Sequence, residues 1–250
     1  MLIDTHCHIH EADYPLDAEE VLSRASAERV KKLICVGTSE ESSREAVEFA
    51  ALHNGVFASV GVHPHEAKDG YGEVERLLGL ERTKIVAVGE IGLDYFYTHS
   101  PRETQIKALE AQIDAALRHD LPIIFHVREA FDDFWPIFDN FHSIRGELHS
   151  FTDSTKNMEE GLKRGLFIGV NGISTFTKDA AQQQMFGAVP LDKMLLETDA
   201  PFLTPTPLRG KVNEPAFVTH VAAFHAEKRG ISPGELAAVT TANAERLFVI

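Results

Sequence analysis

The sequence has few cysteines, no long apolar run and no excess of positive charge, and each shortage excludes a class of protein. Its only two cysteines, Cys7 and Cys35, lie in segments that read as buried strands. A secreted disulfide scaffold uses more cysteine, so we expect two free thiols. No stretch approaches the roughly 20 apolar residues of a membrane span, and the first residues lack the pattern of a signal peptide. We therefore expect a cytoplasmic protein with no membrane partner.

The shortage of basic residues gives a formal net charge of -14. A protein that coats duplex nucleic acid needs clustered Lys and Arg to displace counterions, so this charge disfavours that mode of binding. It does not exclude an enzyme that acts on a strand end, because bound cations supply positive charge that residue counting omits. For the oligomeric state, a monomer is the default expectation.

The chain of 250 residues, 44% hydrophobic and 25% charged, suits one large α/β domain over residues 1–250. Short apolar runs alternate with helical patterns, and no linker or low-complexity tract interrupts them. The candidate strands are Leu2–His6, Leu33–Gly37, Val56–Val62, Lys84–Glu90, Pro122–His126, Gly146–His149, Leu166–Val170 and Met194–Thr198.

Several of these runs are continuously apolar, as expected of parallel strands buried on both faces. The clearest helix is Arg102–Arg118, preceded by a capping box that begins at Ser100. A similar signature at Ser232 precedes a last helix that reaches about Leu247. Eight strands separated by helices predict an α/β fold, a single (β/α)8 TIM-type barrel with its active site at the C-terminal face of the strands. A doubly wound open sheet is the alternative.

The unusual feature of the composition is its thirteen histidines, several of which stand where the predicted strands end. In several predicted strands, a charged or imidazole side chain follows the apolar run at its C-terminal end. The residues at these ends are His6, His8, His63, His65, Glu90, His126, His149 and Asp199.

Side chains alternate along a strand, so His6 and His8 face the same side and can share a metal. Six donors (His6, His8, Glu90, His126, His149 and Asp199) exceed the needs of a structural zinc, and they predict two divalent cations such as Mg, Mn or Zn. Glu90 can bridge the two cations, which acidify bound water and make hydroxide the nucleophile. Asp199 suits the role of general base, with Glu197 supporting it from one layer deeper. Glu90 and Asp199 are thus the expected catalytic carboxylates.

A single histidine at a strand end is more often structural, and His-x-His alone is a weak motif. The full set of six donors at the ends of five strands is harder to explain as packing, because each buried polar group would need its own partner. The set is therefore interpreted as a metal site.

The motifs around these residues resemble those of the TatD family of metal-dependent deoxyribonucleases, within the amidohydrolase superfamily. They span nearly the whole chain in the family's order. The resemblance implies a barrel fold, and it implies that His6, His8, Glu90, His126, His149 and Asp199 are metal ligands, with Asp199 also catalytic. The matching segments are Ile3–His8, Gly61–His65, Val88–Tyr95, Phe125–Arg128, Leu148–Phe151, Glu197–Leu203 and Asn213–Pro215.

The resemblance also implies an activity, the hydrolysis of DNA phosphodiesters, with 3′ exonuclease action on single strands in some members. A deacylase that acts on misacylated transfer RNA has been proposed for relatives. The chain departs from the family pattern at two places. Asp153 stands where many members have Gly, and Val212 stands where Arg often precedes the Asn-Glu-Pro segment, although Arg209 and Lys211 lie nearby.

Residues around the predicted metals are candidates for substrate contacts. His63 is predicted to bind a substrate phosphate oxygen, against the alternative of a loop histidine without a ligand. Arg128 can clamp phosphate or pair with neighbouring acids, Glu129 or Asp132. Asp94 can orient a ligand histidine or cap a turn. The aromatic residues Tyr95, Phe96 and Tyr97 can stack unpaired bases or pack over the barrel mouth.

Three functions of different classes follow from the sequence. The first is a metal-dependent nuclease whose partner is DNA, single-stranded or at strand ends. The second is a hydrolase of a small ester or amide, or a D-aminoacyl-tRNA deacylase, because the same hydroxide attacks a carbonyl. The third is a catalytically silent binding protein built on the same scaffold. The first is favoured, the acidic net charge is the best support for the second, and the filled ligand positions argue against the third.

Overall fold

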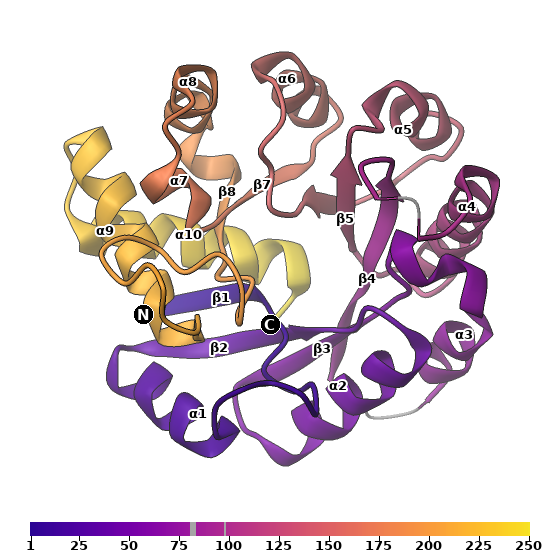
Figure 1. Cartoon of the computed structure of the whole chain (residues 1–250), viewed down its shortest axis with the longest axis horizontal. Coiled ribbons are helices and arrows are strands. Elements are labelled where there is room, and N and C mark those ends of the chain that lie inside the picture. The colour runs from indigo at the N-terminus through magenta and orange to yellow at the C-terminus, as the bar shows by residue number, and fades with distance from the viewer. Residues whose placement is uncertain (81–83, 98) are drawn as a thin grey trace. The chain divides into compact units, whose positions relative to one another are not determined.

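The computed structural model describes residues 1–80, 84–97 and 99–250. Its eight strands form one sheet in sequence order, and the strand pairs β1–β2, β3–β4, β4–β5, β5–β6 and β7–β8 are parallel. Helices follow the strands along the chain, so the predicted (β/α)8 fold class is confirmed (Figure 1). The strands are β1 (Leu2–Cys7), β2 (Val30–Val36), β3 (Val56–Val60), β4 (Ile85–Asp94), β5 (Ile123–Arg128), β6 (Gly146–Leu148), β7 (Phe167–Val170) and β8 (Met194–Leu196).

The helices include the predicted Arg102–Arg118, which is confirmed at both ends, and the predicted C-terminal helix, which begins at Pro233. No helix in the described residues has the length and apolar character needed to cross a membrane. The α-helices are α1 (Ala18–Ala27), α2 (Glu40–Leu52), α3 (Gly72–Leu78), α4 (Arg102–Arg118), α5 (Phe131–Phe138), α6 (Thr155–Lys163), α7 (Ile173–Phe176), α8 (Ala180–Ala188), α9 (Val218–Arg229) and α10 (Pro233–Phe248); the short 3-10 helices are η1 (Pro64–Asp69), η2 (Leu191–Lys193) and η3 (Pro215–Phe217).

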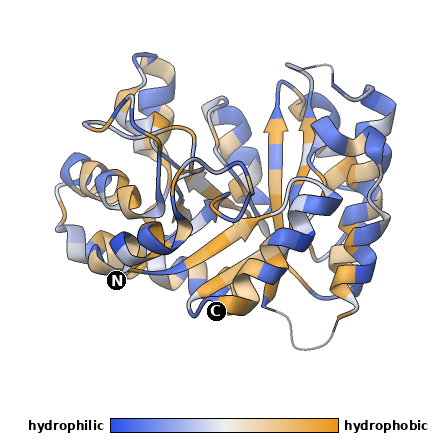
Figure 2. Ribbon diagram, turned by 60° about the horizontal axis from the view of Figure 1, so that its bottom comes forward, coloured by the Kyte–Doolittle hydropathy of each residue, from blue (hydrophilic) through white to orange (hydrophobic). Residues whose placement is uncertain are grey.

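The core consists mainly of strand residues, and Figure 2 shows the strands largely in the hydrophobic colour while the helices carry both colours. Every residue of β1, β6, β7 and β8 is buried. Strands buried on both faces are typical of parallel sheets covered by helices, and they explain the continuous apolar runs in the sequence. Both cysteines are buried free thiols, as predicted.

The chain forms two compact units. One comprises Met1–Cys35 with Ser150–Ile250, and the other comprises Val36–His149. The first therefore contains β1, β7 and β8, and the second contains β3 to β6.

Seven of the eight strand ends differ from the prediction, by one to four residues, and only the end of β7 at Val170 agrees. The differences at β4 and β8 follow from contacts with neighbouring segments. β4 was expected to end at Glu90 but continues to Asp94, because Gly92 and Asp94 pair with His126 and Arg128 of β5 after a register shift. β8 was expected to reach Thr198 but ends at Leu196. The amide of Thr198 instead donates to the side chain of Asp4, at 2.8 Å, which takes this segment out of the strand ladder.

The predicted capping box before α4 is wrong. Pro101 is the residue that caps this helix, and it offers no side-chain hydrogen bond. Ser100 instead donates its hydroxyl to the carbonyl of His65 at 2.6 Å and accepts from the amide of Lys68. The cap before α10 is confirmed, since the Ser232 hydroxyl accepts from the amide of Glu235 at 3.1 Å.

Candidate metal centre

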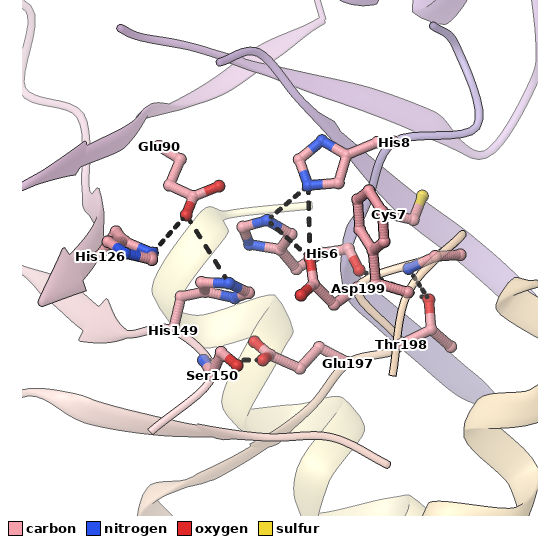
Figure 3. Close-up of polar contacts among 12 residues, drawn as sticks. His6, Cys7, His8, Glu90, His126, His149, Ser150, Glu197, Thr198 and Asp199 are labelled. Atoms are coloured by element: carbon pink, nitrogen blue, oxygen red, sulfur yellow. Dashed lines mark hydrogen bonds and ion pairs between the residues drawn. The ribbon is translucent and has the colours of Figure 1, made fainter. Parts of the chain in front are cut away.

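The first group of predicted ligands lies where β1 ends beside the segment that follows β8. Backbone hydrogen bonds join the two, from Asp199 N to His6 O at 2.9 Å and from His8 N to Ala200 O at 2.8 Å. The alternation of side chains places His6 and His8 on one side, as predicted, with their Nε2 atoms 3.2 Å apart. Both rings point toward the Asp199 carboxylate (Figure 3).

The three donor atoms of this group have spacings that fit one cation. Asp199 Oδ1 lies 3.3 Å from His8 Nε2 and 3.7 Å from His6 Nε2. Bonds of about 2.1 Å at a tetrahedral angle separate two ligand atoms by about 3.4 Å. Two imidazoles and a carboxylate at these spacings can supply three of the four ligands of a tetrahedral metal ion.

Asp4 supports this group and was missed at the sequence level. Its carboxyl group accepts the Thr198 amide and lies 2.6 Å from the Thr198 hydroxyl, so it fixes the residue before Asp199. Burial raises the pKa of Asp4 to about 8, against the hydrogen bonds from Thr198 that lower it. A buried acid in the middle of an apolar strand was the signal that could have revealed it.

Glu197 holds the neighbouring turn. Its Oε1 accepts from the amide of Ser150 at 2.8 Å and from the amide group of Asn171 at 3.2 Å. Ser150 has a positive φ of 47° and directly follows His149 in the chain. Glu197 therefore fixes the backbone of the residue after a predicted ligand, in line with the supporting role expected of it.

The second group of predicted ligands surrounds Glu90, which is 4% exposed. Its Oε1 lies 2.8 Å from His126 Nδ1 and 3.8 Å from His149 Nε2 (Figure 3). His63 Nε2 lies 3.6 Å from the same oxygen. Three imidazoles thus approach one buried carboxylate, and His63, Glu90 and His126 each offer a ligand atom within 4.8 Å of the others.

His126 has a carboxylate at each ring nitrogen. Nδ1 faces Glu90, and Nε2 lies 3.2 Å from Asp94 Oδ2. An imidazole in this position carries either two protons or one proton and one cation. Burial lowers the pKa of His126, but its hydrogen bonds to Asp94 and Glu90 outweigh burial and raise it. A divalent cation on Nδ1 would replace the second proton, so the donor set fits a metal here.

Asp94 combines the two roles predicted as alternatives. Its Oδ2 lies 2.9 Å from His65 Nε2 as well as facing His126, and its Oδ1 accepts from the amides of Phe96 and Tyr97. Burial raises the pKa of Asp94, and the hydrogen bonds from His126 and Tyr97 outweigh it, so the pKa is lowered overall. Asp94 is an ionised carboxylate that orients a predicted ligand and also caps the following turn.

Two glutamines on the inner face of α4 hold this region and were missed at the sequence level. Gln105 accepts from the amide of Asp94 and donates to its carbonyl, and Gln112 does the same for Val62. Both are buried. A glutamine repeated at seven residues along the apolar face of a helix was the available signal.

His63 is arranged as a hydrogen-bond donor. Its Nδ1 accepts from the amide of His65 at 3.1 Å. Burial lowers the pKa of His63, so the ring is neutral and its one proton lies on Nε2, the nitrogen that faces Glu90. In this tautomer Nε2 can donate a hydrogen bond to a substrate oxygen.

Arg128 and the aromatic residues form a surface that we call the aromatic patch, comprising Phe96, Tyr97 and Arg128. The Arg128 guanidinium lies 3.8 Å from the centre of the Phe96 ring and 5.1 Å from that of Tyr97. Phe96 is 48% exposed and Tyr97 is 43% exposed. Tyr95 is not part of this patch, because its hydroxyl donates a hydrogen bond to Asp133 at 2.6 Å.

At both places where the chain departs from the family pattern, the structure provides hydrogen-bond partners. Asp153 accepts from the amide of Ser154 and the side chain of Asn157 and so supports the start of α6. Glu214 in the Asn-Glu-Pro segment has its basic partner in Arg24 of α1, through hydrogen bonds of 2.7 to 2.9 Å.

Known proteins are similar to this chain over its whole length. Residues 3–249 match the family described as TatD related DNase. An uncharacterized metal-dependent hydrolase of Bacillus subtilis, YabD, is 38% identical over 256 residues, all of both proteins. A protein of Citrobacter rodentium named 3′-5′ ssDNA/RNA exonuclease TatD is 34% identical, over all of this chain and 98% of that one. The solved structure of YJJV, a TatD homologue from Escherichia coli, has a TM-score of 0.92 at 30% identity, covering all of this chain and 98% of that one.

Proposed function

Because the chain belongs to the family of TatD-related DNases, its chemistry is metal-dependent hydrolysis, and we propose that its substrate is DNA, cleaved from the 3′ ends of single strands. The observation that carries the proposal is the spacing of His6, His8 and Asp199, whose donor atoms lie 3.2 to 3.7 Å apart. The name of the Citrobacter relative supports a nucleic-acid substrate.

We assign the predicted ligands to two divalent cations. His6, His8 and Asp199 hold one, and Glu90, His126 and His149 hold the other, while the bridging role predicted for Glu90 stays a prediction. When bound, such cations polarise a phosphodiester and acidify water. Mg, Mn and Zn all suit nitrogen and carboxylate donors.

The protein's own residues supply the proton transfer and the substrate contacts. Asp199 accepts the proton of the attacking water through a carboxylate oxygen. The oxygen of that water forms the new bond to phosphorus, the bond from phosphorus to the leaving sugar oxygen breaks, and that oxygen takes a proton from solvent water to leave as a hydroxyl group. His63 donates a hydrogen bond through Nε2–H to a phosphate oxygen, and the aromatic patch stacks the bases at the strand end.

The test uses protein stripped of metal and then supplied with Mg, Mn or Zn. The substrates are single-stranded DNA labelled at the 5′ end, duplex DNA, single-stranded RNA, an acylated RNA and a carboxyl ester. We expect stepwise shortening of the single strand that stops with chelator. In Glu90→Gln and Asp199→Asn, kcat should fall by about 100-fold or more.

Asp133→Asn is the matched control, because Asp133 is an acid that pairs with Tyr95 and Arg102 and not with the predicted ligands. Full activity of both Glu90→Gln and Asp199→Asn would refute the assigned roles. Turnover of the ester or the acylated RNA with DNA untouched would refute the nuclease proposal in favour of the second function.

A further inference from the structure

A cavity of about 330 Å³ lies among α7, α8 and α9, the helices grouped at the upper left of Figure 1. Its volume falls at the lower end of the range of about 300 to 1,000 Å³ typical of small-molecule sites. None of its lining residues belongs to the predicted metal ligands. All of them lie in the unit that comprises Met1–Cys35 and Ser150–Ile250.

The charged groups of the cavity are all basic, although the chain carries a net charge of -14. Lys228 and Arg229, at the end of α9, line it together with His225, and no Asp or Glu is among the lining residues. A basic cavity in an acidic protein concentrates anions rather than cations.

Arg229 has one buried donor, Nε, for which the described residues provide no acceptor. Its Nη2 donates to the carbonyls of Val189, at 2.8 Å, and Phe186, at 3.3 Å, which end α8. Its Nε is buried and meets no acceptor within the part of the chain that the structure describes. Burial lowers the pKa of Arg229, with no opposing contribution from a carboxylate. A buried, charged donor without an acceptor is unfavourable, and an anion oxygen would satisfy it.

The walls of the cavity suit a flat ring. Phe186 and Phe224 line it, with their ring centres 6.5 Å and 5.4 Å from that of His225. His225 is itself fixed, because its Nε2 lies 2.9 Å from the hydroxyl of Ser174, which donates to the carbonyl of Asn171. Aromatic rings pack edge to face or offset against such walls.

We propose that this cavity binds a small oxyanion attached to a flat ring, with Arg229 and Lys228 contacting the anion and Phe186 and Phe224 contacting the ring. The shared chemistry is a phosphate, phosphonate or carboxylate group on an aromatic body. The site does not depend on the proposed nuclease function.

The test is calorimetric titration of the metal-loaded protein with phenylphosphonate, phenylacetate, inorganic phosphate and the neutral benzyl alcohol. We expect one saturable site for phenylphosphonate, for phenylacetate or for both, and the ligand that binds identifies the preferred anion. Inorganic phosphate and the alcohol should bind more weakly. Lys228→Gln and Arg229→Lys should each weaken binding of the ring-bearing anion about tenfold or more, as expected when a charge-assisted hydrogen bond is lost.

Arg229→Lys retains the positive charge but loses the Nε donor. It therefore distinguishes a hydrogen bond from Nε to the anion from electrostatic attraction alone. Lys156→Gln, which removes an exposed lysine of α6, is the matched control and should bind normally. Glu90→Gln should also leave this binding unchanged, because anion uptake at the predicted metals is a separate event. Circular dichroism checks that each variant is folded.

The proposal is overturned if no ring-bearing anion binds to the wild type. It is equally overturned if benzyl alcohol binds as tightly as the anions. A third contrary result would be that Lys228→Gln and Arg229→Lys both bind the anion normally while Glu90→Gln does not bind it.

Discussion

At the scale of single residues, Asp94 links the predicted metal ligands to the aromatic patch. One of its oxygens faces His126 and His65, and the other accepts the amides of Phe96 and Tyr97. The carboxylate is 1% exposed, and α4 holds its backbone through Gln105. A change at Asp94 should therefore affect metal binding and the aromatic patch together.

We expect Asp94→Asn to weaken binding of the metal at Glu90, His126 and His149 about 10- to 100-fold, because the amide orients the His126 ring less strongly. Metal content after dialysis, measured by mass spectrometry, and the metal concentration needed for half-maximal activity test this. Asp133→Asn again serves as the control. Unchanged metal affinity in Asp94→Asn would show that His126 needs no carboxylate at Nε2.

The aromatic patch offers a prediction on substrate binding. Phe96→Ala and Tyr97→Ala should each raise KM for single-stranded DNA about tenfold, because stacking of one base is worth about 1 to 3 kcal/mol. We expect kcat to change little, since both rings lie against Arg128 rather than against the predicted metal ligands. Leu52→Ala, at a side chain that is 80% exposed, is the control. An unchanged KM in both variants would show that the aromatic patch does not contact the DNA.

At the scale of elements, the pairing of β4 with β5 places Glu90, Asp94 and His126 within contact distance. The strands pair through to Asp94 and Arg128, beyond the register shift that contains Glu90. Gly92 is needed for this pairing, because its φ is +156° and a Cβ atom there would lie 1.7 Å from the carbonyl oxygen of His126.

Gly92→Ala should therefore separate β4 from β5, lower the free energy of unfolding by about 3 kcal/mol or more and abolish activity. Gly187→Ala is the matched control, because nothing lies within 4 Å of a Cβ atom built at that helical glycine. It should raise the free energy of unfolding by up to about 1 kcal/mol. Denaturant titration measures both, and equal stability of the two variants would contradict the close approach at Gly92.

At the scale of the whole molecule, His225 contributes to the loss of folding stability at low pH. Burial lowers the pKa of His225 from 6.5 to about 3. Between these values the unfolded chain binds a proton that the folded protein does not. The free energy of unfolding therefore falls as the pH is lowered through this window, by about 1.4 kcal/mol per pH unit from this group.

His225→Gln keeps a donor toward Ser174 and removes the titration. Its unfolding free energy, measured by denaturant titration at several pH values within the window, should depend on pH less steeply than that of the wild type by this slope. His142→Gln, at an exposed loop histidine, should retain the wild-type slope. Parallel curves for the wild type and His225→Gln would show that His225 is protonated in the folded protein.

The sequence by itself determined the eight strands, the boundaries of α4 and the shared side of His6 and His8. Each follows from a periodicity of two or 3.6 residues, which is a property of local chain geometry. It also identified the carboxylates and imidazoles that stand at or near the strand ends, because polar residues that interrupt apolar runs are visible without coordinates.

Only the tertiary structure decided what those residues contact. The length of β4 depends on its register with β5, the early end of β8 depends on Asp4, 194 residues away from Thr198, and the partner of Glu214 is Arg24, 190 residues away. The acceptors of Arg229 Nη2 are likewise carbonyls of another segment, those of Phe186 and Val189. Local periodicity carries no information about such pairings, since they are selected by packing and hydrogen bonding once the strands have been brought into register.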